Sequence, residues 1–125
     1  MELVRIGRPG SRFKVLATCD ARGECPVLDF LDDLGQSEAK LRTTVLAFLR
    51  ERVAEHGPPT NDEQCKELED GILEFKKGPV RILWFWDSGQ MILCTHAFRK
   101  KTQKTPIREI APELVNTPET GAVRN

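Results

Sequence analysis

Apolar residues recur at helical spacing in two successive segments of the chain. The first stripe occupies positions i, i+3, i+4 and i+7: Val27, Phe30, Leu31 and Leu34. Such a stripe predicts a helix that packs one face against a core. Pro26 suits the first position of this helix, because its missing N–H needs no partner there, and Gly35 is expected to end it.

The second stripe predicts a longer helix that begins after Ser37, a residue able to cap it, and reaches about His56. Its apolar positions share one face: Leu41, Val45, Phe48, Leu49 and Val53. The sequence Gly57-Pro58-Pro59 ends the helix, since proline cannot continue it. Two amphipathic helices with a short connection form a helical hairpin, and each needs a flat apolar surface to cover.

Apolar runs bounded by turn-forming residues predict four strands, at residues 13–18, 72–76, 80–86 and 91–98. The last two are apolar on both faces, which is typical of strands at the centre of a sheet covered on two sides. The first twelve residues are expected to be an irregular lead-in with room for a short strand at 3–6. Residues 63–68 are expected to form a short turn of helix. Trp84 and Trp86 share one face of their strand, so both are expected to pack in the core rather than stack on bases.

The order of the expected elements is β-α-α-β-β-β-α, with a last helix that begins at Pro106 and is interrupted by Pro112. This order predicts one α+β domain over residues 1–115, with a small antiparallel sheet and the helical hairpin on one face. The second face of the sheet then needs a further helix or a partner protein. Residues 116–125 are polar and are expected to be a disordered tail.

The composition, 39% hydrophobic and 30% charged in 125 residues, is that of an ordinary globular protein. The N-terminus shows no apolar signal-peptide region, so a cytoplasmic location is expected. The four cysteines, at positions 19, 25, 65 and 94, show none of the spacings of metal ligands. Free thiols are therefore expected, with no metal and no other cofactor.

The net charge of zero hides a strong segregation of charge along the chain. Residues 76–108 contain eight basic residues and one acidic residue, whereas residues 20–75 contain six basic and fourteen acidic residues. The first nineteen residues add four basic residues against one acidic residue. Such asymmetry suggests that the basic part meets a polyanion or an acidic partner. The alternative is that two solvated faces merely differ in charge.

The basic segment contains the most specific motif of the chain. Its sequence HAFRKKTQKTP, at residues 96–106, follows the pattern h-G-F-x-K-K-T-x-K-T-P, with Ala97 where glycine is usual. Together with LEDGILE at residues 68–74 and Arg81 early in the next strand, it resembles the RelE/ParE superfamily of bacterial toxins, in its HigB-type, phage-derived branch. The resemblance covers about residues 68–110, and the helical hairpin agrees with it in order and length.

This resemblance implies a compact toxin of a type II toxin–antitoxin system, with a cognate antitoxin, expected to be a helix-turn-helix protein, over its basic face. The better-known activity of the superfamily is ribosome-dependent cleavage of mRNA, which would make the chain a metal-independent endoribonuclease that inhibits translation. The ParE side of the superfamily inhibits DNA gyrase instead. The alternative is therefore a non-catalytic growth inhibitor, either directed at gyrase or a phage-derived host-inhibition protein.

RNA cleavage through the 2′-hydroxyl needs a base, an acid for the leaving 5′-oxygen, and cations for the extra negative charge on the phosphate. The basic segment offers the catalytic candidates Arg81, His96 and Lys100 and the RNA-binding candidates Lys76, Lys101 and Lys104. The chain has no tyrosine, a residue that several RelE-type ribonucleases use near the C-terminus. That role is then empty, or filled by His96 or a lysine with a lowered pKa, and the missing tyrosine favours the non-catalytic alternative.

Each candidate also has a purely structural interpretation. Arg81 is the one charge in an apolar strand, where it could clamp a phosphate or pair with a carboxylate such as Glu74. His96 could exchange a proton near neutral pH, or it could be a hydrogen-bonded core residue. The lysines could bind RNA phosphates or form a solvated loop that docks an acidic antitoxin segment, and both uses are compatible.

Overall fold

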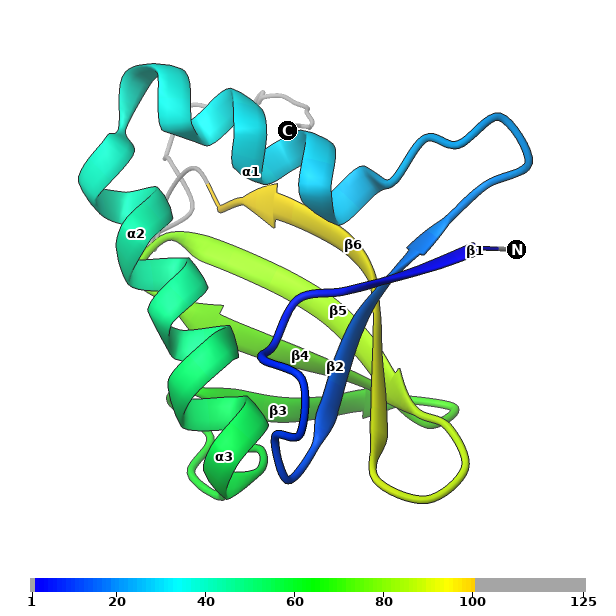
Figure 1. Cartoon of the computed structure of the whole chain (residues 1–125). Coiled ribbons are helices and arrows are strands. Elements are labelled where there is room, and N and C mark those ends of the chain that lie inside the picture. Colours follow the sequence, from blue (N-terminus) through cyan, green and yellow to red (C-terminus); the bar gives the residue numbers. More distant parts are fainter. Residues whose placement is uncertain (1, 101–125) are drawn as a thin grey trace, which may run out of the picture.

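A six-stranded sheet runs through the part of the chain that the computed structural model describes, residues 2–100 (Figure 1). Its strands are β1 (Glu2–Arg5), β2 (Lys14–Cys19), β3 (Cys65–Glu69), β4 (Ile72–Lys77), β5 (Val80–Trp86) and β6 (Met91–Arg99). They lie in the order β1-β2-β6-β5-β4-β3. The expected last helix and the tail at 116–125 lie outside the described residues.

The sheet is mixed rather than antiparallel, which corrects the expected topology. Strands β3 to β6 form an antiparallel meander, and β1 pairs antiparallel with β2. Strand β2 pairs with β6 in parallel, with Val15 opposite Ile92 and Leu16 opposite Leu93. The α+β class is confirmed, but the two halves of the sheet are joined by this one parallel contact between strands far apart in the sequence.

Both helical segments follow the apolar stripes, although their junction differs from the expected one. Helix α1 (Pro26–Ser37) continues through Gly35, where a Cβ atom would lie 2.6 Å from Cδ of Arg42. The absence of a side chain at Gly35 therefore leaves room for the Arg42 side chain of the next helix. The break falls at Glu38, with φ −138° and ψ 66°, and Ser37 does not cap the second helix.

The second helical segment is continuous from Ala39 to His56, as the apolar stripe predicts. It consists of α2 (Ala39–Ala47), a π-helical turn η1 (Phe48–Val53) and α3 (Ala54–His56). Gly57 ends it with a φ of 85°, a conformation in the region that favours glycine. Within residues 2–100, no helix is long and apolar enough to cross a membrane.

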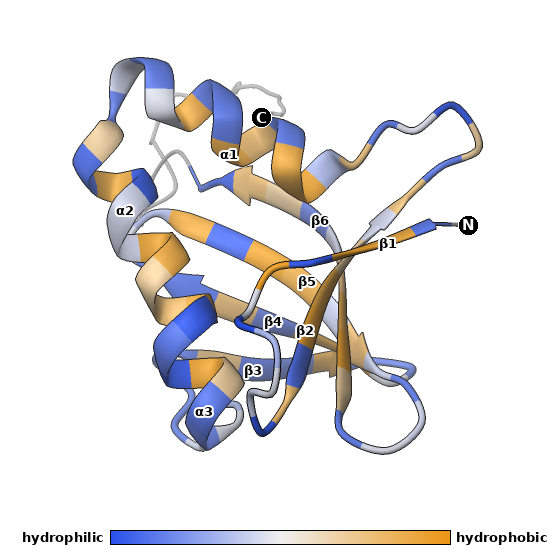
Figure 2. Cartoon of the chain, in the orientation of Figure 1, coloured by the Kyte–Doolittle hydropathy of each residue, from blue (hydrophilic) through white to orange (hydrophobic). Residues whose placement is uncertain are grey.

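The core lies between these helices and one face of the sheet. The central strands β2, β5 and β6 contain long hydrophobic stretches, whereas α2 and α3 alternate between hydrophobic and hydrophilic residues (Figure 2). Trp84 is fully buried, stacks on Phe75 with ring centroids 4.7 Å apart, and is confirmed as a core residue. Trp86 is 44% exposed and contacts Trp84 and Phe13 only at the edge of the core, so its expected burial is wrong.

The acidic segment before β4 forms a strand and not the expected turn of helix at 63–68. Strand β3 is an edge strand that pairs with β4, and a register shift separates Glu67 from Glu69. Asp70 and Gly71 both have positive φ, 53° and 80°, as a two-residue hairpin turn requires. This turn brings β3 back beside β4, which overrides the weak helical tendency of the segment. Strand β1 also forms, one residue earlier than the range 3–6 allowed by the sequence.

The expectation of four free thiols is wrong for two of them, because Cys19 and Cys25 form a disulfide. Cys19 ends β2 and Cys25 precedes α1. The carboxylate of Asp20 accepts hydrogen bonds from the backbone N–H groups of Arg22 and Glu24, which folds the loop back on itself. This local turn brings the two cysteines together, although no spacing rule in the sequence indicates it.

Candidate functional site

Arg81 lies on the face of the sheet that points away from the helices. Val80, Ile82 and Trp84 face the helices and are at most 1% exposed. Successive side chains of a strand point to opposite faces, so Arg81 projects to the other side. We call this side the helix-free face, since no helix of residues 2–100 packs into it; among its residues are Lys76, Arg81, Leu83, His96 and Phe98.

The guanidinium of Arg81 is held by the turn between β4 and β5. Its Nη1 donates hydrogen bonds to the carbonyl oxygens of Gly78, at 2.7 Å, and Val80, at 3.1 Å. The side chain is 6% exposed, and within residues 2–100 it forms no ion pair with Glu74 or any other carboxylate. Backbone carbonyls therefore replace the carboxylate partner that the sequence had left open.

A row of side chains crosses the helix-free face through Arg81. Lys76 of β4 lies opposite Arg81, which in turn lies opposite Phe98 of β6. Side chains at such opposed positions have Cβ atoms about 4.5–5.5 Å apart, so the row is continuous. Lys77 points to the other face, where its Nζ lies 5.4 Å from the ring centroid of Phe48. Only the first of the two lysines therefore belongs to the candidate site.

A β-bulge places His96 on the same face. Leu83 pairs with His96 and Trp84 pairs with Cys94, which leaves Thr95 as an extra residue of β6. Regular alternation from the buried Cys94 would put His96 in the core, whereas the extra residue turns it outward. His96 is accordingly exposed and lies diagonally across from Arg81. The interpretation of His96 as a core residue is therefore wrong.

Lys100 lies beside the same turn, at the end of β6. Its backbone N–H donates to the carbonyl oxygen of Pro79 at 2.7 Å, and the residue is exposed. Arg99 points to the other face and pairs with Glu38 at 2.6 Å. The structure thus brings Lys76, Arg81, His96 and Lys100 to one end of one face. The candidates Lys101 and Lys104 lie outside the described residues.

No curated protein matches the chain. The family described as "Phage derived protein Gp49-like (DUF891)" matches residues 29–112. The chain belongs to this Gp49-like family. The family is related to the RelE/ParE-like toxins.

The match to the Gp49-like family contains the whole candidate surface, because Lys76, Arg81, His96 and Lys100 all fall within residues 29–112. It also contains most of α1, the whole second helical segment and strands β3 to β6. Strands β1 and β2, with the first basic residues of the chain, precede it. The family relation therefore concerns the meander and the helices, and it leaves the N-terminal strands unassigned.

The chemistry of the surface in this Gp49-like protein comes from cations and one imidazole. Lys76, Arg81 and Lys100 can neutralise phosphate oxygens, and His96 can give or take a proton. The two free thiols add no nucleophile, since the thiolate is the reactive form. Burial raises the pKa of Cys94 to about 12, and burial also raises the pKa of Cys65. No group of three or more potential metal ligands occurs in the stretch 2–100.

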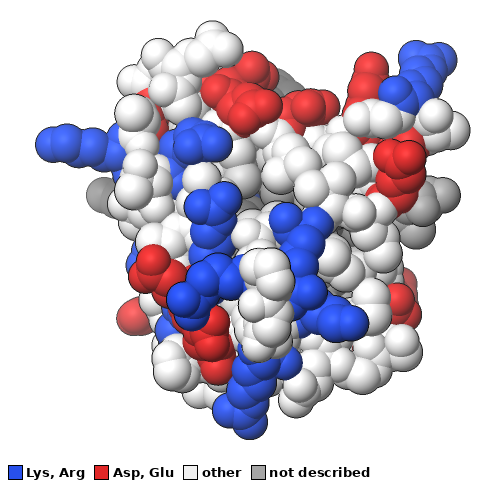
Figure 3. Space-filling view, viewed as in Figure 1, with Lys and Arg blue, Asp and Glu red and all other residues white. Residues whose placement is uncertain are grey.

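A second basic region of the Gp49-like protein was not singled out by the sequence. Lys and Arg side chains gather near the middle of the face seen in Figure 3. One hollow of the molecule is lined by Arg5 and Arg8, from the basic N-terminal segment, and by Arg50, from the π-helical turn η1. The excess of basic residues in the first nineteen positions was the only sign of this basic region in the sequence analysis. It did not indicate that Arg50, on a distant helix, joins them.

Proposed function

We propose that this Gp49-like protein is the toxin of a type II toxin–antitoxin system, of the HigB type, and that it cleaves mRNA on the ribosome. One observation supports this function above all. A lysine, an arginine, an exposed histidine and a second lysine lie together on the helix-free face: Lys76, Arg81, His96 and Lys100. These are the groups that RNA cleavage through the 2′-hydroxyl requires.

In this reaction the 2′-oxygen attacks the adjacent phosphorus, and the bond from phosphorus to the 5′-oxygen breaks. A base removes the 2′-proton, and an acid delivers a proton to the 5′-oxygen, leaving a cyclic phosphate and a 5′-hydroxyl end. His96 is suited to one of these proton transfers, because it is exposed and lies beside the cations. Arg81 and Lys100 stabilise the charge that accumulates on the phosphate oxygens, and Lys76 holds the RNA backbone.

The rigid mounting of Arg81 supports its role. A guanidinium fixed by two backbone carbonyls needs little reorganisation when negative charge develops near it. The two bonds involve Nη1, and a guanidinium carries five N–H donors in all, so the fork keeps donors for a phosphate oxygen. Lys101 and Lys104, which follow Lys100 in the sequence, are proposed as further RNA-binding residues.

The decisive experiment adds the purified protein to a translation extract with ribosomes and maps the ends of the mRNA. Wild-type protein is expected to block translation and to leave new 5′-hydroxyl ends. His96→Gln should reduce cleavage strongly, and Arg22→Gln, in an exposed loop far from the site in sequence, serves as the control. Blocked translation with intact mRNA would refute the nuclease function.

A non-catalytic growth inhibitor is the second candidate, and the absence of tyrosine from the chain favours it. In that case the basic surface binds its target without cleaving RNA. Expression in cells would then arrest growth while mRNA stays intact, and a supercoiling assay would separate inhibition of gyrase from other targets. In both cases we propose that an antitoxin covers the same surface, and that it is a helix-turn-helix protein with an acidic segment. Co-expression with a neighbouring reading frame tests this, because the frame that encodes the antitoxin should restore growth.

A further inference from the structure

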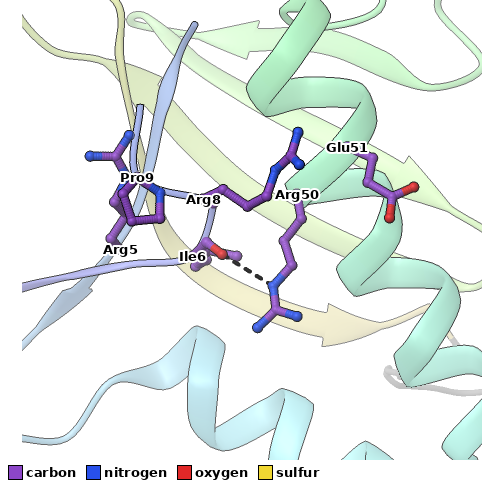
Figure 4. Close-up of a pocket in the computed structure, with 7 residues that line it drawn as sticks. Arg5, Ile6, Arg8, Pro9, Arg50 and Glu51 are labelled. Carbon is purple, nitrogen blue, oxygen red and sulfur yellow. Dashed lines mark hydrogen bonds between the residues drawn. The ribbon is translucent and has the colours of Figure 1, made fainter. Parts of the chain in front are cut away.

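A hollow of about 590 Å³ lies between the segment that follows β1 and the π-helical turn η1 (Figure 4). It is lined by Arg5, Ile6, Gly7, Arg8, Pro9, Arg50 and Glu51. Its volume falls within the range of small-molecule sites, about 300–1,000 Å³. Three of its seven lining residues are arginines from two elements far apart in the sequence, so the fold has assembled a cationic cavity.

Arg50 is fixed in this cavity by the backbone. Its Nε donates a hydrogen bond of 3.2 Å to the carbonyl oxygen of Ile6 (Figure 4). Ile6 is itself buried, and its N–H donates to the carbonyl oxygen of Val15 at 2.7 Å. Within residues 2–100, the two Nη groups of Arg50 have no hydrogen-bond partner, and they can grip an anion together. The turn that carries Arg50 is π-helical, a geometry found frequently at functional sites.

Arg5 brings a buried donor to the same cavity. Its Nη2 donates to Oγ of Ser11 at 3.2 Å, and that hydroxyl donates in turn to the carbonyl oxygen of Phe13 at 2.7 Å. The Nε of Arg5 is buried and has no acceptor among the described residues. A buried guanidinium nitrogen without an acceptor is costly, and it leaves the positive charge of Arg5 without a counter-charge from the described residues beside the hollow.

The charge of the cavity stays positive after its carboxylates are taken into account. Arg8 pairs with Glu55 at 2.6 Å, but this arginine side chain is 70% exposed and the pair is solvated. The carboxylate of Glu51 points away from the three guanidinium groups (Figure 4). Arg5 and Arg50 therefore keep uncompensated charge within the hollow.

We propose that this hollow binds a phosphate group, either of a free nucleotide or of an RNA backbone. The guanidinium groups of Arg5, Arg8 and Arg50 border the hollow and point in different directions (Figure 4), so each can contact a different oxygen of a phosphate-containing ligand. Arginine is the preferred residue for such contacts. The cavity shares no lining residue with the candidate nuclease surface, and Arg50 comes from η1, whereas that surface lies on the helix-free face. Phosphate binding here does not depend on mRNA cleavage by the helix-free face.

Three probes test the site: inorganic phosphate, a nucleoside 5′-monophosphate, and an RNA oligonucleotide with 2′-O-methyl groups, which cannot be cleaved. The arginine Nε–Hε NMR signals of Arg5 and Arg50 should shift with at least one of them. Arg50→Lys keeps the charge but loses the fork, and it should weaken binding about tenfold, whereas Arg22→Gln should not. For RNA, affinity falls as salt rises, and the slope of log affinity against log salt should be less steep by about 0.7 in Arg8→Gln, which loses one phosphate contact.

Each result decides the matter. Binding of the monophosphate but not of RNA assigns the hollow to a nucleotide, and the reverse assigns it to the RNA backbone. If none of the probes shifts the two arginine signals, or if Arg22→Gln weakens binding as much as Arg50→Lys does, the hollow is not a phosphate site. Should Arg50→Lys fail to fold by circular dichroism, Arg8→Gln carries the test, since the Arg8 side chain is 70% exposed and, within residues 2–100, bonds only to the carboxylate of Glu55. Because the methylated RNA is not a substrate, a failed nuclease function would leave these results unchanged.

Discussion

The guanidinium of Arg81 is bonded to the carbonyl oxygen of Gly78 at 2.7 Å, so the candidate catalytic cation and the β4–β5 turn form one rigid unit. The turn is fixed from its other side as well, because the N–H of Lys100 donates to the carbonyl oxygen of Pro79. The end of β6 and the candidate catalytic cation are thus both bonded to the two-residue turn Gly78–Pro79. Changes to Arg81 should therefore affect both activity and local stability.

Arg81→Ala should lower the free energy of unfolding by about 1–3 kcal/mol, because it leaves the carbonyls of Gly78 and Val80 without their buried donor. It should also reduce mRNA cleavage by about 100-fold or more, the loss typical when a donor to developing negative charge is removed. Urea unfolding and single-turnover cleavage measure the two effects. Lys66→Ala removes a cation from the edge strand β3 on the same face and should change neither by a comparable amount.

Deletion of Thr95 should be tolerated, because Thr95 is the extra residue of the bulge. Without it, Cys94 stays opposite Trp84, His96 stays opposite Leu83, and both keep their faces. We expect a loss of about 1 kcal/mol or less, from the weak hydrogen bond between the Thr95 hydroxyl and the Leu83 carbonyl.

Deletion of Ala97 is the matched control for the bulge. It moves Phe98 to a position that faces the helices and reverses the alternation that follows, since a slip of one residue exchanges the faces. This variant should lose more than about 3 kcal/mol or fail to fold. If the deletion of Thr95 destabilises as strongly as the deletion of Ala97, the assignment of the bulge is wrong. Urea unfolding followed by tryptophan fluorescence compares the two variants.

Stability should fall as the pH rises above about 9. Burial raises the pKa of Cys94 from 9.0 to about 12, so the folded protein keeps a proton that the unfolded chain releases. A group with a raised folded-state pKa contributes its full stability below the unfolded value of 9.0 and loses it between 9.0 and 12. The pKa of Cys65 is also raised, chiefly by burial.

For one proton the slope is about 1.4 kcal/mol per pH unit within this window. The urea concentration at the midpoint of unfolding, measured between pH 8 and 10.5, should therefore fall as the pH rises. Cys94→Val has a similar volume and no proton to lose, so its curve should be flatter than that of the wild type. Parallel curves for the two proteins would mean that Cys94 is not protected by burial.

Reduction of the disulfide between Cys19 and Cys25 should lower the free energy of unfolding by about 2 kcal/mol, the loop-closure value for so short a separation in sequence. Thermal unfolding with and without a thiol reductant measures the effect. The double variant Cys19→Ser/Cys25→Ser should unfold at the temperature of the reduced protein and should not respond to the reductant. A wild-type protein equally indifferent to the reductant would show that the bond does not form in solution.

The sequence by itself determined the elements whose signal lies within a few neighbouring residues. The stripe from Val27 to Leu34 and the longer stripe from Leu41 to Val53 predicted both helical segments, because an amphipathic face repeats every three to four residues. The apolar runs predicted β2, β4, β5 and β6. The charge pattern and the ending at 96–106 indicated a basic surface and the toxin-related family.

The tertiary structure alone decided how these elements meet. The parallel pairing of Val15 with Ile92 joins strands far apart in the chain, and its register depends on the packing of the whole core. The bulge at Thr95 turned His96 outward, whereas the sequence left a core position open to it. The contact of Arg50 with Ile6 likewise depends on packing of the N-terminal strands against η1. Periodicity records which side of an element is apolar, but not which distant element covers it, and the cationic hollow could therefore be seen only in the folded chain.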